Sequence, residues 1–269
     1  MLKNITIGQY FPGESVIHNL DPRIKIIAVI FYIASLFFMN EFVYYIPAVV
    51  LLGVTIGLAR LPVKYIFKGL KPILILIIIT FLINMFMTPG EVAFRVGPLT
   101  ATEEGIRQAS FMGIRLILLV VCTTVLTLTT SPILLTDGIE KLLEPFKKIG
   151  VPSHELAMMM TIALRFIPTL LEETDKIMKA QMARGADFES GNIIKRAKNL
   201  IPLLVPLFIS AFRRADDLAM AMEARCYRGG DNRTRMRELK LRKPDIVFFL
   251  IVFIYLIAII IFRYFVNIG

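Results

Sequence analysis

Cysteine and histidine are scarce in this sequence, with two of each among 269 residues. Cys122 lies in an apolar run and Cys226 in a basic one, and they form no Cys-x-x-Cys pair. The sequence therefore predicts neither a disulfide framework nor a zinc site. His18 and His154 lie far apart along the chain and lack the regular spacing of metal ligands. We expect no metal ion and no cofactor.

Sequence signatures of nucleotide binding and hydrolysis are also missing. The chain has no Walker A loop, no HExxH pair and no GxSxG elbow. We therefore expect a protein that is not itself an ATPase or another enzyme. The first 23 residues contain no apolar core of a cleavable signal, but the turn pairs Pro12-Gly13 and Asp21-Pro22. The first hydrophobic run is expected to be retained as a span.

Apolar residues, by contrast, are abundant. They make up 56% of the chain, against the roughly 45–50% of a soluble domain. A helix needs roughly 17–25 residues to cross a bilayer. Five runs come close to or reach this length, and they cover residues 24–39, 42–59, 72–87, 112–130 and 246–266. The sequence predicts an all-α polytopic membrane protein with about five transmembrane helices.

The short loops predict how these helices are oriented. The connection after the second run carries four cations, whereas the connection after the first, Asn40-Glu41, carries none. Cytoplasmic loops are enriched in Lys and Arg. We therefore expect the N-terminus to be cytoplasmic, together with the loop that contains Arg60, Lys64, Lys68 and Lys71. Five spans then place the C-terminus outside.

The stretch from residue 131 to residue 245 holds 20 of the 31 Lys and Arg residues. Its apolar runs, Leu156–Leu164 and Leu200–Ala211, are short for spans, and strongly charged sequence follows each of them. An amphipathic segment, Pro132 to Ile149, precedes both. We predict a membrane domain at 1–130 with four helices, a cytoplasmic domain of long amphipathic helices at 131–244, and a final transmembrane helix at 245–269.

The net charge of +10 is explained by this distribution rather than by nucleic acid. The basic run Arg233–Lys243 immediately precedes the last span, where attraction to anionic lipid accounts for it. No aromatic residues are interleaved there to stack on bases. The lipid bilayer is thus an expected partner, and nucleic acid is not.

Two charged segments repeat each other at a constant offset of 41 residues. Asp175-x-Ile177-x-x-Ala180-x-x-Ala183-Arg184 matches Asp216-x-Leu218-x-x-Ala221-x-x-Ala224-Arg225. Chance similarity between helix-forming segments is one interpretation. The other is a duplicated docking device, in which small alanines allow close approach and an arginine bonds carboxylates or carbonyls of a partner. Two equivalent ends would imply two equivalent partners.

At this point the chain resembles a family along nearly its whole length. It is similar to the transmembrane T-components of energy-coupling factor transporters, the ABC importers for vitamins and trace metals in prokaryotes. The matching motifs are Gly8-Gln9-Tyr10-x-Pro12-Gly13-x-Ser15-x-x-His18-x-Leu20-Asp21-Pro22-Arg23-x-Lys25, Thr129-Thr130-Ser131-Pro132, Leu164-Arg165-Phe166-Ile167-Pro168, Ala180-Gln181-x-Ala183-Arg184-Gly185 and Ala221-Met222-Glu223-Ala224-Arg225.

The resemblance implies coupling helices whose ends sit in grooves of two cytoplasmic ATPase subunits. It also implies a separate membrane-embedded subunit that binds the substrate, and a location in the plasma membrane of a prokaryote. The docking residues implied by the match are Ala183, Arg184, Gly185, Ala224, Arg225 and Cys226. The second motif reads Ala-Arg-Cys rather than Ala-Arg-Gly, which makes a left-handed backbone less expected at Cys226.

Two other functions stay open from the residues alone. A permease with its own substrate pathway would need polar residues clustered within the spans, and the sequence has few. A membrane-bound enzyme would need clusters of His, Asp or Glu at the cytoplasmic edge, but the carboxylates lie mostly beside Lys or Arg, as on a solvated surface. The sequence does not identify the transported compound.

Overall fold

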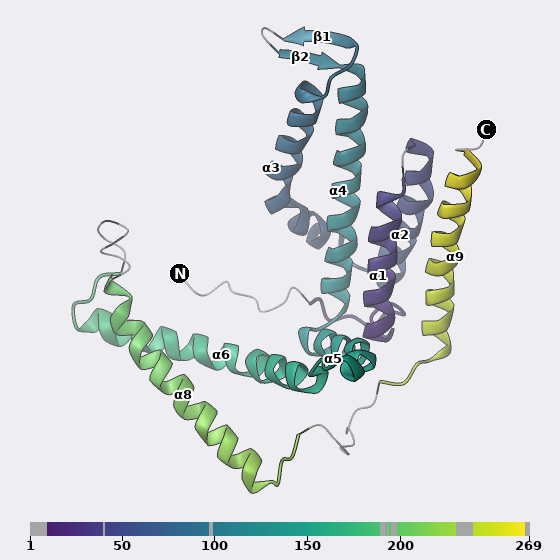
Figure 1. Ribbon diagram of the computed structural model, residues 1–269. Coiled ribbons are helices and arrows are strands. Elements are labelled where there is room, and N and C mark those ends of the chain that lie inside the picture. Colours follow the sequence, from purple (N-terminus) through teal and green to yellow (C-terminus); the bar gives the residue numbers. More distant parts are fainter. Residues whose placement is uncertain are drawn as a thin grey trace. The chain divides into compact units, whose positions relative to one another are not determined.

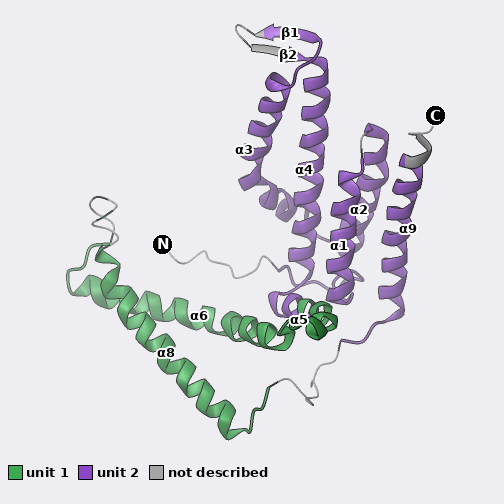
Figure 2. Ribbon diagram, in the orientation of Figure 1, with its two compact units in different colours: residues 1–7, 139–237 green, residues 8–138, 238–269 purple. Residues whose placement is uncertain are grey.

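The computed structural model describes residues 10–39, 41–96, 99–188, 192, 194, 198–229 and 239–266. The chain divides into two compact units, shown in different colours in Figure 2. The larger unit comprises residues 8–138 and 238–269, and the smaller unit comprises residues 1–7 and 139–237. The boundary between them falls inside helix α5.

The larger unit is a set of long helices (Figure 1). Helix α3 packs against α4, and α1 packs against both α4 and α9. A short antiparallel hairpin, β1–β2, joins α3 to α4, and a 3-10 turn, η1, precedes α2. The elements are α1 (Pro22–Phe37), η1 (Phe42–Tyr44), α2 (Tyr45–Ala59), α3 (Val63–Met87), β1 (Val92–Val96), β2 (Leu99–Thr102), α4 (Glu103–Thr129) and α9 (Lys243–Val266).

Several of the most deeply buried side chains in this unit lie where helices pack together. Leu36, Ala48 and Leu128 have no exposed surface, and they come from three different helices. Large apolar side chains elsewhere point outward, including Ile75 at 67% exposure and Ile254 at 62%. Water would make such a surface unfavourable, whereas lipid is as apolar as these side chains. The pattern fits a helical protein whose solvent is the bilayer.

Within the described residues, five helices are long and apolar enough to cross a membrane. They are Phe42–Ala59, Val63–Met87, Glu103–Thr129, Ser153–Ala183 and Lys243–Arg263. Four overlap predicted spans, so the expected all-α polytopic membrane fold is confirmed. The predicted span at residues 24–39 corresponds to α1, which has only 16 residues and falls short of the length criterion. The fifth candidate helix is instead α6, which was predicted to lie outside the bilayer.

Two helices begin earlier than the apolar runs that predicted them. Helix α3 begins at Val63 rather than Pro72, because proline inside a helix can be accommodated by a bend, which Figure 1 shows. Helix α4 begins at Glu103 rather than Met112. The Thr102 side chain caps it by accepting from the Gly105 N–H (3.0 Å), and two glutamates in its first turn favour the start.

The smaller unit is built on two long helices. Helix α5 (Pro132–Leu143) continues into the 3-10 segment η2 (Glu144–Ile149), and α6 (Ser153–Ala183) and α8 (Ile201–Ala224) follow. Both long helices run through an internal proline, Pro168 or Pro206, without ending. Helices α6 and α8 pack against each other. Residues 230–238, which include much of the predicted basic run 233–243, lie outside the described residues.

Candidate functional site: the ends of two repeated helices

The two predicted docking segments form the C-terminal ends of α6 and α8. Arg184 caps the first helix with φ −87° and ψ 5°, and Arg225 caps the second with φ −91° and ψ 13°. The next residue is left-handed in both cases, with φ 88° at Gly185 and 54° at Cys226. The two ends therefore share one backbone conformation at the 41-residue offset.

The same backbone hydrogen bonds close both ends. At the first, the Gly185 N–H donates to the Met182 carbonyl (3.0 Å) and the Ala186 N–H to the Gln181 carbonyl (3.0 Å). At the second, the equivalent donations come from Cys226 to Glu223 (2.8 Å) and from Tyr227 to Met222 (3.0 Å). This is the Schellman arrangement, which satisfies carbonyls at a helix end. Chance similarity of sequence would not require this agreement in geometry.

The expectation about Cys226 was wrong. A left-handed backbone is unfavourable by roughly 1–2 kcal/mol for a residue with a side chain, and the expectation rested on this local preference alone. The structure nevertheless places Cys226 in that region, because the conformation lets two N–H groups reach helix carbonyls. Cysteine thus takes the position that glycine holds at the other end.

All six residues of the two ends are exposed: Ala183, Arg184, Gly185, Ala224, Arg225 and Cys226. Within the described part of the chain, no carboxylate pairs with either arginine. The guanidinium groups are therefore available to carboxylates or carbonyls of another chain, with two parallel bonds each. The small alanine before each arginine leaves room for a partner surface to approach the helix.

Helices α6 and α8 are tied together partway along by charge. The Arg214 guanidinium bonds the Glu173 carboxylate at 2.7 Å, with the two side chains 36% and 22% exposed. Nearer the end of α6, the Gln181 amide donates to the Pro202 carbonyl at 3.5 Å. From the sequence, the charged halves of these helices were expected to be solvated surfaces. That interpretation was wrong for Glu173 and Arg214, which face each other across the crossing.

The second end is attached through the side chain that follows its left-handed residue. Tyr227, directly after Cys226, lies with its hydroxyl 3.4 Å from His154 Nε2 at the start of α6. His154 Nδ1 in turn lies 3.2 Å from a Glu140 carboxylate oxygen on α5. The equivalent of Tyr227 at the first end is Ala186, which has no polar side chain. The two ends are alike in backbone but differ in how they are held.

The N-terminal motif of the chain contributes to a cluster of hydrogen-bonded polar groups in the larger unit, which we call the polar knot. Ser15 and His18 hydrogen-bond through Oγ and Nδ1 at 2.7 Å, and His18 Nε2 lies 3.0 Å from the Phe11 carbonyl. Lys25 is 4% exposed, and its Nζ donates to the carbonyls of His18 (3.1 Å) and Thr129 (3.0 Å) and to the Thr130 hydroxyl (3.1 Å). Two separate family motifs therefore meet at one ammonium group. Gly8 and Gln9, which open the motif, lie outside the described residues.

A second buried group in this knot was missed by the sequence analysis. Asp245 is 2% exposed and accepts from the N–H groups of Asp21 (2.7 Å) and Arg242 (2.6 Å). Asp21 in turn caps α1 by accepting from the Arg23 N–H (2.9 Å). The available signal was a lone carboxylate in the first turn of an otherwise apolar span, where a charge needs a partner.

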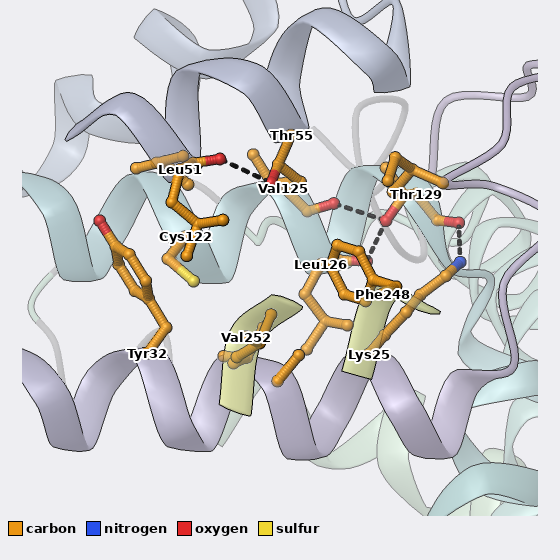
Figure 3. A pocket seen from close by; sticks show the side chains of 14 residues that line it. Lys25, Tyr32, Leu51, Thr55, Cys122, Val125, Leu126, Thr129, Phe248 and Val252 are labelled. Atoms are coloured by element: carbon orange, nitrogen blue, oxygen red, sulfur yellow. Dashed lines mark hydrogen bonds between the residues drawn. The ribbon is translucent and has the colours of Figure 1, made fainter. Parts of the chain in front are cut away.

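A small cavity lies beside the knot (Figure 3). Its volume is about 50 Å³, and its walls come from α1, α2, α4 and α9 and from Ile17 before α1. Polar groups on its walls already have hydrogen-bond partners. Lys25 Nζ donates as described, the Thr55 hydroxyl donates to the Leu51 carbonyl (2.8 Å), and the Thr129 hydroxyl donates to the Val125 carbonyl (2.8 Å). The cavity offers little polar chemistry for a substrate. Among the described residues, no group of three His, Cys, Asp or Glu side chains could hold a metal ion.

Comparison with known proteins identifies the family. The family CbiQ, described as cobalt transport protein, matches residues 13–236. The chain is 61% identical over 250 residues to the energy-coupling factor transporter transmembrane protein EcfT of Thermosediminibacter oceani, covering 93% of this chain and 94% of that protein. It is 64% identical over 249 residues to EcfT of Clostridium kluyveri, covering 92% of each chain. With EcfT of Bacillus subtilis, identity is 51% over 244 residues, covering 89% of this chain and 91% of the relative.

These matches reach over both units and include both repeated helix ends. The suspected resemblance is confirmed, and with it a multi-pass membrane protein that works in a complex with other subunits. The chain belongs to the family of CbiQ and EcfT proteins, the transmembrane components of energy-coupling factor transporters.

Proposed function

We propose that this chain is the scaffold that passes ATP-driven movement from two cytoplasmic ATPases to a substrate-binding membrane subunit. The observation that carries the proposal is the pair of helix ends, which repeat each other hydrogen bond for hydrogen bond and leave Arg184 and Arg225 exposed. Two equivalent ends suit two equivalent sites, such as those on the two halves of an ATPase dimer. In this proposal the chain performs no chemistry, and its partners hydrolyse ATP.

The proposed orientation follows from the positive charges. Arg60, Lys64, Lys68 and Lys71 are all exposed near the start of α3, which supports a cytoplasmic position for this segment and for the N-terminus. Residues 131–244 are then cytoplasmic, and the C-terminus is outside the cell. The membrane is the plasma membrane of a prokaryote. Although α6 is long enough to span, its second half carries Glu173 paired to α8, which favours a place at the cytoplasmic surface.

The apolar half of α8 is the proposed contact for the substrate-binding subunit. Its exposed apolar side chains include a helical stripe, with exposures from 51% to 68% at Ile201, Val205, Phe208 and Phe212. A stripe of this kind is unfavourable in water and suits an apolar partner or lipid. ATP binding would close the two ATPases, displace the arginine ends and shift this stripe under the substrate-binding subunit. The cargo would be a vitamin or another micronutrient.

Pull-down of co-expressed ATPase subunits tests the docking ends. We compare the wild type with the Arg184→Glu plus Arg225→Glu double variant in the full-length membrane-inserted chain. Because both guanidinium groups are exposed and unpaired within the described chain, the double variant should insert and purify normally but capture at least about tenfold less ATPase, as expected for lost charge-assisted bonds of about 1.5–3 kcal/mol. Arg213→Glu, an exposed arginine on α8 away from its end, is the matched control. Equal capture by wild type and double variant would reject the docking role.

A further inference from the structure

The pairing of Glu173 with Arg214 has a symmetry that the sequence repeat makes visible. The offset of 41 residues that superimposes the two helix ends also carries Glu173 onto Arg214. The ion pair between α6 and α8 therefore joins two positions that are equivalent in the repeat. When two equivalent helices cross, a residue contacts its own counterpart only where the axis that exchanges the helices passes.

A second contact gives the direction of the crossing. Gln181 lies beyond Glu173 along α6, while its partner Pro202 lies before Arg214 along α8. The two helices therefore run in roughly opposite directions past each other, which is compatible with a two-fold axis that passes through the ion pair. Arg184 follows Glu173 by eleven residues, as Arg225 follows Arg214. Each end thus lies about 16 Å along its helix from the crossing, at 1.5 Å per residue.

We infer that Glu173 and Arg214 are positioning residues that form the pivot of the two coupling helices and set the separation of their arginine ends. The pair is suited to this because it is partly shielded, so its attraction is less screened than at a free surface. It connects the helices at a point from which the two arginine ends lie the same number of residues away. The consequence for transport rests on the proposed docking function, but the geometry of the pivot does not.

The pivot is tested by a distance between the two ends in the full-length chain in lipid nanodiscs. Spin labels on cysteines at Met182 and Met220, which are 49% and 65% exposed, report this distance. Cys226 is replaced by glycine in this background, while the buried Cys122 is out of reach of the label. Glu173→Arg and Arg214→Glu each place like charges at the crossing, and each should shift or broaden the distance by several ångströms.

The exchange of both charges supplies the decisive comparison. Because the two positions are equivalent, the double variant Glu173→Arg plus Arg214→Glu restores the pair in mirror order and should return the distance to that of the parent. The exposed sequence neighbours Glu172→Arg and Arg213→Glu are the matched controls and should leave it unchanged. Where a reversal fails to insert, Glu173→Gln removes the attraction without adding repulsion.

Two results would overturn the pivot: single reversals that leave the distance unchanged, or an exchanged pair that fails to restore it. Neither depends on ATPase binding, so each is separate from a failure of the docking proposal. With ATPases co-expressed, the single reversals should lower capture about fivefold and the exchanged pair should recover it. A normal distance in the exchanged variant with no capture by any variant, the wild type included, would keep the pivot and reject the docking function.

Discussion

Cations play opposite parts in the two units. In the larger unit, Lys25 is buried and all three donors of its ammonium group are used inside the chain. In the smaller unit, Arg184 and Arg225 are exposed, and within the described residues they pair with no carboxylate. A buried charge that is fully bonded holds elements together, whereas an exposed unpaired one is free for another molecule. Substitutions in the larger unit should therefore change stability, and those at the helix ends should change assembly.

The largest effect is expected at Asp245. Replacing it with alanine leaves the buried N–H of Asp21 without an acceptor and also removes the bond from the Arg242 N–H, which should destabilise the larger unit by about 2–4 kcal/mol. The measurement is the Tm of the purified chain in detergent, which should fall by several degrees. Asp217→Ala removes an exposed carboxylate of α8 and serves as the matched control. If both variants have the same Tm, the Asp245 bonds of the polar knot do not stabilise the unit.

A smaller effect should separate the two helix ends. Gly185→Ala puts a Cβ on a left-handed residue, and since no atom lies within 4 Å of it, the cost is that of the backbone alone, about 1 kcal/mol. Cys226→Gly removes the same strain at the other end and should stabilise it by a similar amount. Hydrogen exchange at the amides of residues 185–186 and 226–227 measures both. Shifts in the same direction would mean that the two ends are not equivalent.

The smallest effect concerns the pH dependence of the larger unit. Burial lowers the pKa of His18, although the hydrogen bond with the Phe11 carbonyl raises it in part. The unfolded chain then binds a proton more readily than the folded one, so stability is present above the unfolded pKa of 6.5 and falls as the pH drops below it. The Tm should decrease between pH 7.5 and pH 5.5, and less so in His18→Gln. An unchanged pH dependence in that variant would exclude His18 as the cause.

The sequence allowed the helical class and most spans to be predicted, because runs such as 246–266 need only length and composition. Helix starts were harder. Helix α4 begins well before its apolar run because Thr102 caps it, a signal that hydropathy does not contain. Glycine favours the left-handed conformation found at Gly185, whereas the same conformation at Cys226 runs against local preference.

The contacts between distant segments were the least predictable. The pairing of Glu173 with Arg214 depends on how α6 crosses α8, and nothing in either segment states that crossing. The repeat offset was visible in the sequence, but its meaning as a symmetry axis needed the contact. Likewise, Asp245 gave no sign of the Asp21 N–H that it would accept. Patterns within one element could be predicted from the sequence, whereas contacts between different elements could not.

The bond between Asp21 and Asp245 has a consequence for how the protein is made. The two residues are 224 positions apart, at the start of the first helix and the start of the last. The start of α1 therefore makes this hydrogen bond only after the start of α9 has been synthesised. A nascent chain that has not reached residue 245 lacks this acceptor for the Asp21 N–H. The two ends of this unit are thus joined late in synthesis, by a single carboxylate.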